Sequence, residues 1–250
     1  MRRVTVLVFC AAMMALTAAG PARAAEIKVI AANAVKESLV DLLSVFEKSA
    51  GHKVTTIWGG TNEIAKRIGG GEVVDIVLIG ASEIDKLIAE GKLLAGSRAD
   101  FARSGVGVAV RAGLPKPDIS SSEAVKKAVL EAKAVAYSSG PSGYYVAELF
   151  KKLGIADQIK DKVKQPTSGG QIGDLLARGE ADLGFHQVSE LLHRKDIEYL
   201  GPLPPEIQNI TVYAAGVHTS AAQEAAKDLI KFLTAPAADP VIRKTGMEPG

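Results

Sequence analysis

Hydroxyl groups and glycines gather in residues 138–143 (SSGPSG), between the apolar run Val135–Tyr137 and an amphipathic run over 144–153. The first backbone N–H groups of a helix have no partner within it, and they carry the positive end of its dipole. A strand, a tight turn and a helix in this order can therefore bind an anion. A serine that only caps its helix gives the same pattern.

Three further turns of small residues follow apolar runs and mostly precede helices. They contain Asn33 and Ala34, Gly60 and Thr61, and residues 167–170 (TSGG). Four such turns around one cleft can present several N–H and O–H donors to a single anion. Because backbone donors and helix dipoles then supply the positive potential, Lys or Arg is not required. The pattern predicts an anion-binding site.

Catalytic signals are weak in comparison. A hydrolase needs a nucleophile with a base and an orienting group, yet the Gly-x-Ser-x-Gly motif and the phosphate-binding Gly-x-x-x-x-Gly-Lys motif are both missing from the sequence. His186 and His193 have no carboxylate or cysteine at metal-ligand spacing. We therefore expect a binding protein rather than an enzyme, with no catalytic residue, metal or cofactor. The alternative is an exported enzyme acting on a small anion, for which only His186 lies near the expected cleft.

Apolar runs alternate with amphipathic ones along the chain, and this alternation predicts an α/β protein with parallel strands and helices on both faces. Ligands of such sheets bind at the carboxyl ends of the strands, where the small-residue turns lie. Residues 201–205 (GPLPP) form the most linker-like stretch. The expected strands are 28–32, 54–58, 75–80, 105–111, 135–137, 163–165, 181–187 and 211–217. The expected helices are 35–50, 63–68, 82–90, 121–132, 144–153, 172–178, 189–193, 221–233 and 238–244.

The first 24 residues have the features of a secretory signal peptide. Two arginines precede an apolar run, and Ala22-Arg23-Ala24 supplies a small-x-small cleavage pattern. Cleavage after Ala24 removes three arginines and Cys10, the only cysteine, so the net charge falls from +2 to −1. We expect a periplasmic protein without disulfides. Without a basic excess, no nucleic-acid partner is expected.

Several stretches resemble the periplasmic molybdate-binding proteins of ABC importers. They are residues 28–54 (KVIAANAVKESLVDLLSVFEKSAGHKV), 57–82 (IWGGTNEIAKRIGGGEVVDIVLIGAS), 141–155 (PSGYYVAELFKKLGI) and 175–187 (LLARGEADLGFHQ). The resemblance implies a bilobal type II solute-binding fold, with lobe I formed by 25–104 plus 201–250 and lobe II by 105–200. The chain would cross between the lobes near 103–104 and 199–205. A monomeric receptor that delivers a small anion to a membrane permease is implied.

The resemblance also implies a ligand site. In that family two serine hydroxyls, two backbone amides and a tyrosine hold the oxyanion. The matching positions here are Ala34, Thr61, Ser142, Gly169 and Gln187. The neighbouring residues Asn33, Gly60, Gly143 and Gly170 complete the candidate set. The pattern does not decide whether His186 or Arg103 contacts the ligand.

Ala34 lacks the hydroxyl, and Gln187 is shorter than a tyrosine. The site would also have more room than a molybdate site. Both molybdate or tungstate and a larger organic acid with carboxylates therefore remain candidate ligands.

Overall fold

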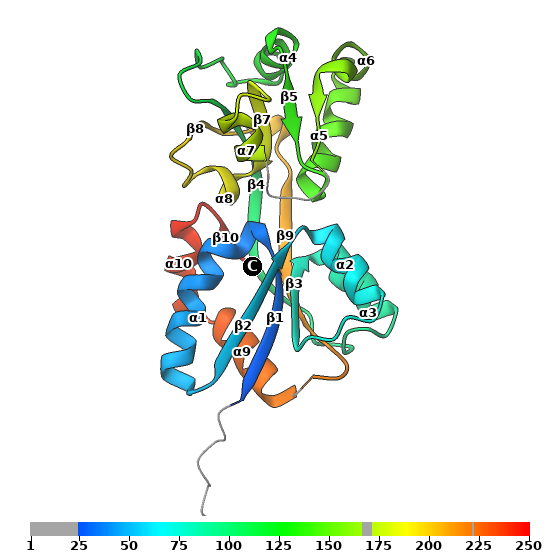
Figure 1. Ribbon diagram of the computed structural model, residues 1–250, viewed down its shortest axis with the longest axis vertical. Coiled ribbons are helices and arrows are strands. Elements are labelled where there is room, and N and C mark those ends of the chain that lie inside the picture. Colours follow the sequence, from blue (N-terminus) through cyan, green and yellow to red (C-terminus); the bar gives the residue numbers. More distant parts are fainter. Residues whose placement is uncertain (1–24, 167–171, 222) are drawn as a thin grey trace, which may run out of the picture.

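Two α/β lobes lie one above the other and are joined by two long strands (Figure 1). The computed structural model describes residues 25–166, 172–221 and 223–250. The signal-peptide prediction thus lies outside the described residues. Within the described ranges, no helix combines the length and apolar character that a bilayer crossing demands.

The sheet of lobe I has the strand order β2-β1-β3-β9-β4. Strand β1 (Glu26–Ala32) pairs in parallel with β2 (Lys53–Gly59) and with β3 (Ile76–Gly80), whereas β9 (Ile210–Val217) is antiparallel to β3. All five residues of β3 are buried, as expected of a parallel strand that helices cover on both faces.

Lobe II repeats this arrangement. Strand β5 (Val135–Tyr137) pairs in parallel with β6 (Val163–Lys164) and β7 (Leu183–Gln187). Strand β4 (Ala99–Arg111) is antiparallel to β7, and β8 (Ile197–Pro202) pairs with the other edge of β4. Each lobe is thus a parallel trio of strands followed by an antiparallel one, which confirms the predicted bilobal fold.

Helices cover both sheets, and their apolar residues form one core cluster in lobe I and two in lobe II. Helix α1, for example, buries Leu39, Leu42 and Phe46, at helical spacing. The helices of lobe I are α1 (Lys36–Ala50), α2 (Thr61–Gly69), α3 (Ala81–Ala89), α9 (Gln223–Leu233) and α10 (Asp239–Lys244). Those of lobe II are α4 (Ser122–Glu131), α5 (Pro141–Lys152), α6 (Ala156–Ile159), α7 (Ile172–Ala177) and α8 (Val188–Leu191). The remaining short elements are η1 (Asn33–Val35), η2 (Lys160–Lys162), η3 (Pro205–Ile207), η4 (Pro236–Ala238) and β10 (Glu248–Pro249).

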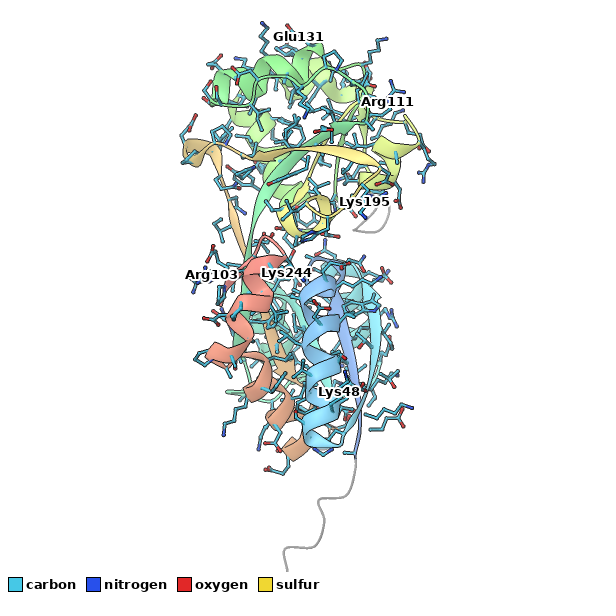
Figure 2. The ribbon with its side chains drawn as sticks, turned by 90° about the vertical axis from the view of Figure 1, so that its left-hand side faces the viewer. Lys48, Arg103, Arg111, Glu131, Lys195 and Lys244 are labelled. Atoms are coloured by element: carbon cyan, nitrogen blue, oxygen red, sulfur yellow. The ribbon has the colours of Figure 1, made fainter. Side chains whose placement is uncertain are left out.

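The connection between the lobes differs from the prediction. Strand β4 begins at Ala99 rather than at 105, and its first half pairs with β9 in lobe I while its second half pairs with β7 and β8 in lobe II. The first half of β4 contains the charged residues Asp100 and Arg103, so a search for apolar runs does not detect it. Figure 2 places Arg103 at the outer edge of the junction, where it is exposed.

The expected linker at 201–205 is also wrong in part, because Gly201 and Pro202 belong to β8. The antiparallel pairing of β8 with Gly107–Arg111 keeps it in lobe II, and Leu203 is buried in the lobe II core. The second crossing is β9 rather than residues 199–205. The rest of the predicted division into lobes stays a prediction.

The Gln208 side chain ties the two crossing strands together. Its Oε1 accepts a hydrogen bond from Val106 N at 2.8 Å, and its Nε2 donates to Val106 O at 3.0 Å. Val106 is fully buried, so its backbone groups depend on protein partners. The glutamine amide therefore takes the place of a strand neighbour at the point where β4 leaves lobe I.

We predict that Gln208→Ala lowers the free energy of unfolding by about 1–3 kcal/mol, because the buried Val106 N–H loses its acceptor. Urea unfolding with an unchanged m-value measures this. Gln158→Ala is the matched control, since that exposed side chain donates only to the Gly154 carbonyl, and surface changes of this kind stay within about 0.5 kcal/mol. Equal losses in both variants would contradict the bracing role.

Candidate functional site

A cavity of about 20 Å³ lies between the lobes, where β1, β2, β5 and β7 end. Its lining residues are Ala32, Asn33, Ala34, Gly59, Gly60, Thr61, Ser138, Gly140, Pro141, Ser142, His186, Gln187, Glu190 and Tyr213. The carboxyl ends of parallel strands from both lobes thus meet at one place, as the sheet topology requires.

Most of the predicted ligand residues lie in this lining. These are Asn33, Ala34, Gly60, Thr61, Ser142 and Gln187. Gly143 is not among the lining residues, and Gly169 and Gly170 lie outside the described residues. Of the two open positions, His186 lines the cavity and Arg103 does not. Contact of any of these residues with a ligand stays a prediction.

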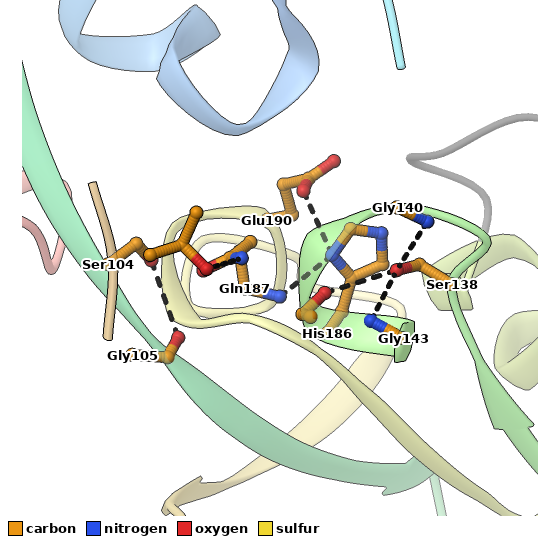
Figure 3. Close-up of polar contacts among 10 residues, drawn as sticks. Ser104, Gly105, Ser138, Gly140, Gly143, His186, Gln187 and Glu190 are labelled. Atoms are coloured by element: carbon orange, nitrogen blue, oxygen red, sulfur yellow. Dashed lines mark hydrogen bonds and ion pairs between the residues drawn. The ribbon is translucent and has the colours of Figure 1, made fainter. Parts of the chain in front are cut away.

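Ser138 organises the turn at the start of α5. Its Oγ accepts hydrogen bonds from Gly143 N at 3.1 Å and Gly140 N at 3.3 Å, and it shares a hydrogen bond with Ser142 Oγ at 3.1 Å (Figure 3). Ser138 and Ser142 are each only 1% exposed. The Gly143 amide therefore already has a hydrogen-bond acceptor within its own turn, the Ser138 hydroxyl.

In lobe I, Thr61 is the first residue of α2 and is buried at the cavity wall. Its Oγ1 accepts a hydrogen bond from Gly80 N at 3.3 Å, which leaves the hydroxyl proton to be donated elsewhere. The η1 turn brings the backbone at Asn33 and Ala34 to the same wall. Two helix starts, α2 from lobe I and α5 from lobe II, thus reach the cavity.

Asn62 links the two lobes across one side of the cavity. Its Nδ2 donates hydrogen bonds to the Ser139 carbonyl at 2.8 Å and to Tyr144 Oη at 3.0 Å. Asn62 lies on α2 of lobe I, whereas Tyr144 lies on α5 of lobe II. The described conformation is therefore a closed one, in which donors from both lobes face the same space.

The end of β7 supplies the wall opposite the two helix starts. Gln187 is 1% exposed, and its Nε2 donates to Thr211 Oγ1 at 3.0 Å. Its Oε1 has no hydrogen-bond partner in the part of the chain that the structure describes. Since the Gln187 amide oxygen and nitrogen are assigned from their surroundings, one amide atom remains for a ligand in either orientation.

His186 and Glu190 form a buried pair in the cavity lining. His186 Nδ1 lies 2.8 Å from Glu190 Oε2, and the two side chains are 5% and 13% exposed. The Gln187 backbone N–H donates a hydrogen bond to Nδ1 at 2.7 Å. A ring nitrogen that accepts through its lone pair carries no proton, so Nδ1 is the acceptor in this hydrogen bond.

Tyr213 on β9 lines the cavity with 2% exposure. Burial, and secondarily the nearby Glu190 charge, raises the pKa of Tyr213 well above its usual range. The phenol is therefore neutral at physiological pH and can donate a hydrogen bond. Sequence reasoning missed it because β9 lies far along the chain from the other site residues.

The lining is polar but nearly free of charge. Among its described residues there is no Lys or Arg, and the ionisable groups are His186, Glu190 and Tyr213. Within the described ranges, His, Cys, Asp and Glu nowhere form a group of three that could hold a metal ion. Chemically, the cavity can donate hydrogen bonds to an anion.

Known proteins share both the sequence and the fold. Residues 27–248 match a family described as bacterial extracellular solute-binding protein. The chain is 34% identical to a Pseudomonas protein named aconitate isomerase, over 88% of this chain and 87% of that one. It is 30% identical to the molybdate-binding protein of Azotobacter vinelandii, over 90% of each chain. A solved structure of a periplasmic molybdate-binding protein from the same organism has a TM-score of 0.77 at 24% identity and covers 90% of this chain and 99% of that chain.

We predict that Gly143→Ala destabilises the protein, by about 1–3 kcal/mol or more. A Cβ at this position would lie 1.5 Å from the Ser138 carbonyl oxygen, so the turn must shift. Gly140→Ala is the matched control in the same turn, because its Cβ would meet nothing closer than 3.8 Å. Thermal unfolding compares the two variants, and equal melting temperatures would refute the packing role assigned to Gly143.

Proposed function

The chain belongs to the family of bacterial extracellular solute-binding proteins, and we propose that it captures a small organic anion with two or more carboxylates between its lobes. The observation that carries this proposal is Glu190 in the cavity lining. A second negative charge at contact distance strongly disfavours a tetrahedral dianion in a partly desolvated site. A polycarboxylate can instead place its uncharged carbon skeleton beside Glu190 and direct its carboxylates to the donors, so it avoids that repulsion.

The lobe I wall supports the same ligand class. Ala34 offers no hydroxyl where the molybdate-binding family has one, and its neighbour Gly60 leaves room. An adjoining groove shares Asn33 and Glu190 with the cavity and is lined on one side by the exposed Lys36. A ligand longer than a tetrahedral anion can extend toward this cation. Aconitate, a propene tricarboxylate, is named as the substrate of the Pseudomonas relative.

In this proposal the protein works as a periplasmic monomer that delivers its ligand to the permease of an ABC importer. Ligand capture closes the lobes about β4 and β9, because donors of both lobes meet only in the closed form. The Asn62 bridge to Ser139 and Tyr144 stabilises that closed form. Neither a metal nor a nucleic acid takes part.

A second candidate function is isomerisation of an unsaturated polycarboxylate. The molybdate-binding relatives support a receptor without enzymatic activity, whereas the Pseudomonas relative is named as an isomerase. The specific observation that favours catalysis is the buried His186–Glu190 pair in the cavity lining, 2.8 Å apart.

We predict that cis- or trans-aconitate or citrate raises the melting temperature more than molybdate, tungstate or sulfate does at equal concentration. A ligand at a hundred times its Kd adds about 2.7 kcal/mol of stability, so a thermal shift screen ranks the candidates. Trp58 fluorescence gives a second readout, because Lys36 of the groove lies 5.9 Å from its ring centroid. Submicromolar molybdate binding without any response to carboxylates would refute the proposed ligand class.

We predict that Thr61→Val weakens binding of the best ligand about tenfold to more than a hundredfold, because a hydrogen bond to a charged partner contributes about 1.5–3 kcal/mol. Isothermal titration measures the change. Thr55→Val provides the control, since Thr55 is exposed on β2 and its hydroxyl donates to Glu26, at 3.2 Å. If both variants bind as the unchanged protein does, Thr61 is not part of the site.

A further inference from the structure

We propose that the groove between α1 and α8 is a carboxylate subsite of the cleft, in which Ser189 and Lys36 bind one end of a tricarboxylate. The central cavity then binds another carboxylate of the same molecule. This inference rests on the proposed function, because it requires a polycarboxylate in the cleft. It adds to that function the residues that distinguish a tricarboxylate from a smaller anion.

The size of the central cavity requires a second compartment for such a ligand. Its volume of about 20 Å³ has room for little more than one water molecule, which needs about 10–15 Å³. The cavity can therefore take at most one carboxylate group of a tricarboxylate. The adjoining groove has a volume of about 380 Å³ and shares Asn33 and Glu190 with the cavity. The rest of the ligand extends into this groove.

The groove lies where the two lobes meet. The start of α1 in lobe I supplies Lys36 and Glu37, and α8 in lobe II supplies Ser189. In Figures 1 and 2, α8 lies next to the start of α1, and α8 contacts η1, which directly precedes α1. A ligand in the groove therefore touches both lobes and stabilises their closed arrangement.

Ser189 is the residue that points to a ligand. It lines the groove and is only 5% exposed. Its Oγ is removed from solvent and has no hydrogen-bond partner in the part of the chain that the structure describes. Buried polar atoms in native proteins nearly always have such a partner. A carboxylate in the groove supplies a charged acceptor, which makes a strong hydrogen bond with a hydroxyl.

Lys36 supplies the positive charge. The second cation of the groove, Arg194, already binds Asp174 at 2.7 Å and Asp196 at 2.5 Å. Lys36 forms no ion pair with any of the described residues, and its Nζ lies 5.9 Å from the centroid of the Trp58 ring. Its charge is therefore available to a carboxylate ligand.

The start of α1 and two acidic side chains define how much negative charge the groove accepts. None of the described side chains caps this 15-residue helix, and its first N–H groups carry the positive end of the helix dipole. Glu37 and Glu190 also line the groove, so a second anionic group there meets repulsion. The groove thus suits one carboxylate at Lys36 and Ser189 rather than a compact dianion.

Ser189→Ala tests the hydroxyl by isothermal titration with trans-aconitate and citrate. We expect Kd to rise about tenfold or more. The melting temperature of the ligand-free variant should stay the same or rise, because the substitution removes a buried hydroxyl that has no partner. Ser44→Ala, at an exposed position on α1, is the control. Lost stability with unchanged affinity would show a structural role and overturn the proposal.

Lys36→Met tests the charge. We expect Kd to rise about fivefold at low salt, as for a charge pair near the surface, and the difference to shrink in about 0.5 M NaCl because salt screens such pairs. Lys48→Met is the matched control, since Lys48 is exposed at the far end of the same helix (Figure 2). Equal losses in the two variants would refute a specific role for Lys36.

The outcomes separate this inference from the proposed function. A crystal structure of the trans-aconitate complex should place a carboxylate within hydrogen-bond distance of Ser189 Oγ and Lys36 Nζ. If the tricarboxylates bind but Ser189→Ala and Lys36→Met leave their affinity unchanged, the subsite is overturned and the proposed ligand class stands. If neither tricarboxylate binds, the ligand class and the subsite both fail.

Discussion

Antiparallel pairing of β4 with β9 is the constraint on which the rest of the structure depends. Both strands cross between the lobes, and their pairing over Ala99–Gly105 joins two otherwise separate cores into one protein. Because each sheet then continues into a parallel trio, the carboxyl ends of both trios face each other. The cavity exists because these two edges are held opposite one another. The Gln208 bridge to Val106 reinforces the point where the crossing begins.

Most hydrogen-bond donors in the cavity lining are uncharged, and this affects which anions the cavity can bind. A Lys or Arg in a closed cleft would bind almost any small anion strongly. Hydroxyls, backbone amides and helix starts attract an anion only when its oxygen atoms match their positions, so geometry contributes most of the selectivity.

A binding cleft and an active site differ little in this fold. A cleft between two lobes that is lined by fixed donors has features that catalysis also requires. The Pseudomonas relative named as an isomerase and the molybdate-binding relatives are both related to this chain over most of its length. Within such a family, function has to be inferred from the cavity residues rather than from the fold.

The sequence by itself determined the repeated β–turn–α units, the α/β class and most residues of the cavity lining. These follow from local periodicity and from turns such as 138–143 and 60–61, whose chemistry lies within a few residues. It also pointed to Gln187 through family resemblance.

Only the tertiary structure decided which distant groups meet there. It brought Tyr213 from β9 to the cavity, directed the Gly143 amide to Ser138, and extended β4 through the charged residues Asp100 and Arg103. It also placed the Glu190 carboxylate beside the His186 ring, because the chain reverses its direction between β7 and α8. Sequence patterns record periodicity along the chain, whereas these contacts depend on strand pairing across it.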